Sequence, residues 1–185
     1  SKIKLIKAGD GDLLTRSSIA ETKIENGMAV SDPERDILKI VVASRYDNNS
    51  PAIGFIKGFN LKKGALACSI AHDSHNLIAV GVTDEDIARA LNLIVESKGG
   101  LAAVSENEQV HLPLEIAGLM ADAPGELVAA SYKALNDFAA KNGSKLNAPY
   151  MTMAFMALLV IPELKLGDKG LFDGLKFEFT PLFID

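Results

Sequence analysis

Runs of apolar residues dominate the first half of the chain and predict a β-rich structure. Apolar and polar positions alternate over 3–7, which predicts a half-buried strand, and Glu25-Asn26-Gly27 between two short apolar runs predicts a hairpin. Four longer apolar runs predict buried strands, which we expect to pair in chain order as a β-meander; they span 37–42, 52–59, 65–71 and 77–82.

Apolar positions in the second half recur at helical spacing. Thr83 is a suitable N-cap, three acidic residues follow it, and Gly99-Gly100 ends the predicted helix. A second helix is predicted over 124–141. A third, buried helix is predicted over 150–159, and Pro162 stops it.

Short β-favouring runs separate these helices. Strands are predicted at 101–104, at 109–112 and, as the last strand, at 175–179. Strands outnumber helices without a regular alternation of the two. We therefore predict an α+β fold, with a mostly antiparallel or mixed β-sheet and two to three helices packed on it.

The first three dozen residues are more polar than those that follow. We expect residues 1–34 to form an N-terminal strand or hairpin extension, or a linker. Residues 35–185 are expected to form one domain, because about 150 residues is a typical domain size.

Composition narrows the class of protein. Of 185 residues, 48% are hydrophobic, which is enough for a sizeable core. The net charge is −5 and no basic run occurs, which argues against a nucleic-acid partner. The longest apolar run, 151–161, is too short to span a membrane, and the first residues lack a signal-peptide pattern. Cys68 is the only cysteine, so we expect a reducing, cytoplasmic location.

A polar cluster between two predicted strands is the main candidate for a site. It consists of His72, Asp73, Ser74, His75 and Asn76, and it holds two of the three histidines in the chain. Imidazole and carboxylate groups can bind a metal ion, transfer protons or hydrogen-bond a substrate. Asp, Ser and Asn in a loop can equally bond their own backbone. These alternatives remain open from the residues alone.

Other residues are weaker candidates. Glu115 and Asp122 flank a predicted loop, where a carboxylate can act as a base, and they are secondary candidates. Cys68 lies in an apolar run without a nucleophile motif, so we interpret it as a small buried hydrophobe.

The segment Ser-Ile-Ala-His-Asp-Ser-His-Asn at 69–76 is distinctive. It is one of several segments that together cover most of 35–183, namely 54–59, 64–65, 69–76, 99–100, 114–120, 149–152, 160–165 and 169–173. Taken in order, these segments resemble the C-terminal domain of adenine deaminase of the bacterial and archaeal type, in the amidohydrolase superfamily.

The resemblance implies a function for a larger enzyme. That enzyme hydrolyses adenine to hypoxanthine and ammonia in purine salvage, and it holds a divalent metal (manganese, iron or zinc) in a barrel domain. A His-x-His pair belongs to the family's metal-ligand set, and this chain has none. A barrel of this kind also needs about 250 residues. We therefore expect no cofactor in this chain, and a barrel domain as its partner, in the same polypeptide or as a separate subunit.

Three functions follow as alternatives. In the first, residues 72–76 close over the barrel's active site and contact adenine, and the chain alone is inactive. In the second, the chain is a non-catalytic structural or oligomerisation module. In the third, it is an independent small metal-dependent hydrolase that uses the His72/His75 loop, with these two residues as weak candidates for metal ligands. Each of the three alternatives is compatible with a homo-oligomer.

Overall fold

The computed structural model describes residues 1–184, which form three helices and fourteen strands. The helices are α1 (Asp84–Glu96), α2 (Gly125–Lys141) and α3 (Pro149–Phe155). The strands are β1 (Lys2–Ala8), β2 (Thr15–Glu21), β3 (Lys23–Glu25), β4 (Met28–Val30), β5 (Leu38–Ala43), β6 (Ala52–Lys57), β7 (Ala65–Ala71), β8 (Asn76–Gly81), β9 (Gly100–Ser105), β10 (Glu108–Pro113), β11 (Leu164–Gly167), β12 (Gly170–Asp173), β13 (Glu178–Phe179) and β14 (Phe183–Ile184).

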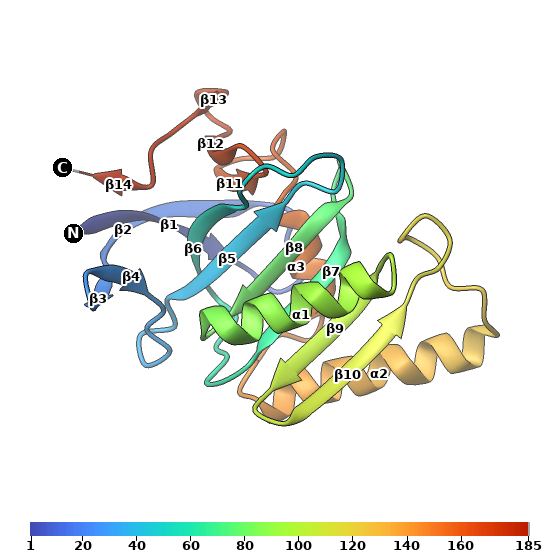
Figure 1. The fold of residues 1–185 in the computed structure, drawn as a ribbon. Coiled ribbons are helices and arrows are strands. Elements are labelled where there is room, and N and C mark those ends of the chain that lie inside the picture. The colour runs from blue at the N-terminus through green and yellow to red at the C-terminus, as the bar shows by residue number, and fades with distance from the viewer. Residues whose placement is uncertain (185) are drawn as a thin grey trace.

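A nine-stranded mixed sheet forms the centre of the molecule (Figure 1). Its order is β10-β9-β7-β8-β5-β6-β1-β14, and β2 pairs along β1. Every pairing is antiparallel except that of β1 with β6. Three helices pack on this sheet, which confirms the predicted α+β class.

The predicted meander is wrong in its strand order. β5 lies between β6 and β8, so β6 and β7 are not neighbours. The connection between β6 and β7 contains Phe59 and Leu61, which are almost completely buried in the main core. Burying two large apolar side chains there is favourable by about 3–6 kcal/mol in total. This gain favours a long connection between β6 and β7, which are not neighbours, instead of a tight turn that would pair them.

Small side chains let α1 lie close to one face of the sheet. Ile87, Ala90 and Ile94 of this helix pack on the sheet residues Ala65, Ala67, Ala79, Ala102 and Val104. The predicted N-cap is confirmed, because the Thr83 hydroxyl oxygen accepts a hydrogen bond from the Asp86 N–H at 3.1 Å. The opposite face, together with α2, α3, β11 and β12, contains the larger core.

α3 ends at Phe155, four residues before the end of the predicted helix at 159. The Lys165 ammonium donates a hydrogen bond to the Phe155 C=O at 3.0 Å, and the Leu166 N–H donates one to the Met156 C=O at 3.0 Å. The Phe155 C=O also accepts the Leu158 N–H at 3.2 Å, three residues later, so neither carbonyl continues the i to i+4 bonding of the helix.

The strand predicted at 175–179 is shorter than predicted, and it is not the last strand, because β14 follows it and pairs with β1. Only Glu178 and Phe179 of 175–179 pair with β12, because the Asp173 carboxylate holds the chain in a turn just before them. It accepts hydrogen bonds from the N–H groups of Leu175 and Lys176 at 3.0 and 3.1 Å.

The N-terminal segment contributes to the sheet. β1 pairs with β6 and β14, and β3 and β4 form the predicted hairpin at Glu25-Asn26-Gly27. The division into residues 1–34 and 35–185 stays a prediction. Within residues 1–184, no helix is long and apolar enough to cross a membrane.

Candidate functional site

Four connections meet at one end of the sheet (Figure 1). They are 44–51 between β5 and β6, 72–75 between β7 and β8, 97–99 between α1 and β9, and 114–124 between β10 and α2. The strand register places them together: the pairs nearest this end are Ala43 with Leu77, Ala71 with Asn76, and Gly100 with Pro113. The predicted site residues all lie in or next to these connections.

His72 is anchored by α3. Its backbone N–H donates a hydrogen bond to the Ala154 C=O at 3.1 Å, and its ring stacks on Phe155 with 5.5 Å between centroids and 25° between planes. The His75 ring lies edge-on to His72, with 6.0 Å between centroids. The structure therefore brings the two histidines together, and both are half-buried.

The neighbouring 44–51 connection holds the rest of the loop. The buried Asn76 accepts a hydrogen bond through Oδ1 from the Arg45 N–H at 3.2 Å. The exposed Tyr46 hydroxyl donates one to the Ser74 C=O at 2.8 Å. Asn76 thus orients the loop, while Asp73 and Ser74 are exposed at its tip.

Three residues of this site were not predicted: Arg45, Tyr46 and Phe155. Phe155 lies inside an apolar run, so no sequence signal separates it from ordinary core residues. An aromatic residue in the polar stretch 44–50 is a weak signal for Tyr46, since exposed loop aromatics often contact another element.

Two imidazoles are too few to hold a metal ion in a typical protein site. Within residues 1–184, no group of three or more His, Cys, Asp or Glu side chains is placed to bind one. His72 and His75 stay weak candidates, and we derive no chemical step from a metal in this chain.

An apolar cavity of about 270 Å³ adjoins His72. Its lining residues are Cys68, Ile70, His72, Leu101, Tyr132, Tyr150, Met151 and Ala154. Burial raises the pKa of the Cys68 thiol to about 12, so the thiol stays protonated and is not a nucleophile. Burial also raises the pKa of Tyr150, whose hydroxyl donates to the Ala102 C=O at 2.9 Å. The cavity is therefore suited to apolar groups rather than to proton transfer.

The secondary candidates lie on the 114–124 connection. Glu115 and Asp122 are both exposed, and the Asp122 N–H donates a hydrogen bond to the Glu115 carboxylate at 3.3 Å. The buried Ser69 ties this connection to β7. Its hydroxyl donates to the Gly118 C=O at 2.5 Å and accepts from the Gly100 N–H at 2.9 Å.

Ser69→Ala is expected to lower the free energy of unfolding by about 1–3 kcal/mol, because it leaves a buried N–H and a C=O without their partner. Ser105→Ala is the matched control. Ser105 is buried on the adjacent strand and its hydroxyl has no hydrogen-bond partner within the described residues, so its loss should cost less than about 0.5 kcal/mol. Urea unfolding measured by circular dichroism checks both values. Equal losses would contradict the role of Ser69.

A nine-stranded sheet with connections gathered at one end defines an α+β domain with a loop-built candidate site. A family model described as the adenine deaminase C-terminal domain matches residues 12–178. The chain belongs to this family, which confirms the resemblance found in the sequence.

Similar proteins are much longer than this chain. Proteins named adenine deaminase are 59% identical in Methanosarcina mazei, 50% in Salinibacter ruber and 43% in Parabacteroides distasonis. These matches cover 99–100% of this chain but only 33–34% of each relative. The chain therefore spans about a third of the length of its relatives.

Proposed function

We propose that this chain is the C-terminal domain of an adenine deaminase, and that residues 72–76 complete the active site of a catalytic barrel elsewhere in the same polypeptide. The match to the C-terminal domain family, across about a third of relatives named adenine deaminase, supports this proposal. The reaction is the hydrolysis of adenine to hypoxanthine and ammonia in purine salvage. The proposal assigns the divalent metal (manganese, iron or zinc) to the barrel and the enzyme to the cytoplasm.

The main observation for the role of the loop is that three contacts hold it in place. The His72 N–H bonds to the Ala154 C=O and its ring stacks on Phe155. The Tyr46 hydroxyl bonds to the Ser74 C=O. A loop held in this way presents its polar groups at small entropic cost. The imidazoles of His72 and His75 can donate to or accept from the ring nitrogens and amino group of a purine. Such a preformed loop, placed over the active site of the barrel, would also exclude bulk water from the reaction.

Histidine substitutions test this role in a chimera of the Methanosarcina mazei adenine deaminase whose matching third is replaced by this chain. His72→Ala and His75→Ala are each expected to lower kcat/KM for adenine by about tenfold or more, since each removes a polar contact to the reacting purine. Steady-state ammonia release measures the effect, and circular dichroism checks folding.

Asn107→Ala is the control, because this exposed residue lies in the turn between β9 and β10 at the other end of the sheet. Unchanged kinetics in both histidine variants would reject the active-site role and favour the structural or oligomerisation module. The unmodified chain without a barrel should not deaminate adenine with added manganese, iron or zinc. Activity there would favour the independent hydrolase instead.

A further inference from the structure

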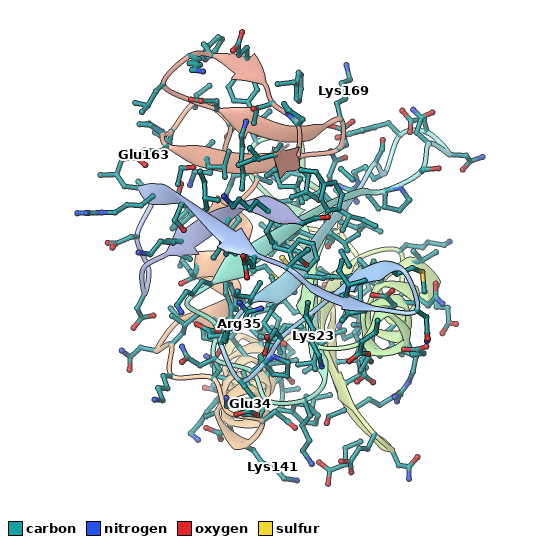
Figure 2. The ribbon with its side chains drawn as sticks, turned by 90° about the vertical axis from the view of Figure 1, so that its left-hand side faces the viewer. Lys23, Glu34, Arg35, Lys141, Glu163 and Lys169 are labelled. Carbon is teal, nitrogen blue, oxygen red and sulfur yellow. The ribbon has the colours of Figure 1, made fainter. Side chains whose placement is uncertain are left out.

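A long hollow runs beside β2, at the opposite side of the sheet from β9 and β10. It consists of a groove of about 950 Å³ and a smaller one of about 200 Å³, which share Glu163 and Leu175 in their linings. We call the two together the β2 groove. Figure 2 views the molecule from this side and places Glu163 where β11–β13 meet β1 and β2.

Large apolar side chains line the β2 groove and are exposed to solvent. The exposed fractions are 44% for Leu13, 63% for Leu14, 65% for Ile19 and 71% for Leu175. Single exposed apolar residues are ordinary on protein surfaces, but several of them around one hollow indicate a contact surface.

The outer edge of β2 is only partly covered. The Thr15 N–H donates a hydrogen bond to the Pro162 C=O at 3.1 Å, the Glu163 N–H donates to the Thr15 C=O at 3.1 Å, and the Ser17 N–H donates to the Glu163 carboxylate at 2.8 Å. Alternation along the strand directs the N–H and C=O of Ile19 to the same edge, and no residue within 1–184 bonds to them there. Unpaired groups on an edge strand are ready to pair with another segment.

The rim of the β2 groove carries both cations and carboxylates. Lys7, Arg16 and Lys176 line it, and none of them forms a salt bridge within residues 1–184. The chain as a whole has a net charge of −5. Asp12, Glu163 and Asp173 line the same groove, so its rim carries both signs of charge and does not by itself select an acidic partner.

Residue 1 lies next to the smaller part of the β2 groove, at the opposite end of β2 from the larger part. The Thr22 N–H donates a hydrogen bond to the Ser1 C=O at 3.0 Å, and Lys2 pairs with Glu21 at the end of β2. Figure 1 shows the N-terminus next to β2 and β14. About two thirds of each longer relative lies outside the matched region, and a C-terminal domain has that part before it.

We propose that the β2 groove docks the part of the polypeptide that precedes this domain in the longer members of the family, with an extended segment pairing along β2 at Ile19. The inference rests on the proposed function, because it requires the chain to be part of a longer enzyme. It adds the surface through which the two parts meet.

Hydrogen–deuterium exchange tests the docking in the chimera described above and in the isolated chain. Amides at 13–21 and 173–184 are expected to exchange at least tenfold more slowly in the chimera, with the largest change at Ile19. The double variant Leu14→Glu/Leu175→Glu should abolish that protection in the chimera. Because both side chains are largely exposed, it should leave the unfolding midpoint of the isolated chain almost unchanged.

Val95→Glu/Leu127→Glu is the matched control. These two side chains are 58% and 62% exposed on α1 and α2, outside the β2 groove, so the chimera should keep its protection. Equal exchange in the chimera and the isolated chain would overturn the inference. Protection that grows with concentration in the isolated chain, with a dimer seen by light scattering, would overturn it in favour of a second copy.

The two proposals fail separately. If the groove is unprotected while His72→Ala still lowers activity, the docking surface is wrong and the active-site loop stands. If the groove is protected while His72→Ala is fully active, the docking surface stands and the role of the loop is wrong.

Discussion

Gly99→Ala is expected to lower the free energy of unfolding by about 3 kcal/mol or more, because it combines backbone strain with a backbone clash. Gly99 has φ +139°, which residues with a side chain rarely adopt. An added Cβ would lie 2.2 Å from the Gly118 Cα. Gly118 cannot move away easily, because its C=O accepts the Ser69 hydroxyl and the Leu114 N–H beside it bonds to the Gly99 C=O.

Gly170→Ala is the matched control. Its φ is +125°, but no atom lies within 4 Å of an added Cβ, so it has the strain without the clash. Urea unfolding of the full chain should therefore show a clearly smaller loss for Gly170→Ala. Equal losses at the two positions would show that Gly118 yields to the new methyl group, which would contradict a rigid contact between 97–99 and 114–124.

The second large effect is expected at Lys165. Its side chain is completely buried, and burial lowers the pKa of its ammonium from 10.5 to about 8. The ammonium donates hydrogen bonds to the C=O groups of Leu13 and Phe155 at 2.5 and 3.0 Å, and no described carboxylate forms a salt bridge with it. The protonated form is therefore less favourable in the folded state than in the unfolded one.

This shift predicts a direction of pH dependence. Between pH 8 and pH 10.5 the unfolded chain binds more protons at Lys165 than the folded chain does, so this residue makes the free energy of unfolding rise with pH. Lys165→Met removes the titrating group and keeps a long apolar side chain. From about pH 7.5 to about pH 10, the wild type should gain about 1 kcal/mol or more relative to Lys165→Met.

The wild type has to be compared with Lys165→Met, because other groups also titrate at alkaline pH. Burial raises the pKa of Cys68 and Tyr150, which makes the folded state less favourable as pH rises, but it does so equally in both proteins. Lys169→Met is the control, since Lys169 is exposed in the turn between β11 and β12 (Figure 2) and should follow the wild type. A pH-independent difference between wild type and Lys165→Met would contradict the prediction.

Local patterns predicted the elements well where the signal lies within the element. The N-cap at Thr83 and the acidic residues after it correctly predicted where α1 begins. The Glu25-Asn26-Gly27 turn correctly predicted the hairpin of β3 and β4. Strand order was missed, since it depends on the distant core residues that bury Phe59 and Leu61 of the connection between β6 and β7.

The candidate site shows the same division. The sequence identified His72 to Asn76 as one polar loop, but nothing in it indicated that Phe155, on a helix much later in the chain, would stack on His72. The end of α3 was missed for a similar reason, because Lys165 on β11 bonds to the last carbonyl of that helix.

By itself, the sequence determined the α+β class, most of the elements, the polar loop at 72–76 and the family to which the chain belongs. Only the tertiary structure decided the strand order, the gathering of four connections at one end of the sheet, and the β2 groove at its other side. The physical reason is the separation along the chain over which each interaction acts. Periodicity and caps act within a few residues, whereas the choice of neighbouring strands and the shape of a surface depend on which distant side chains pack together.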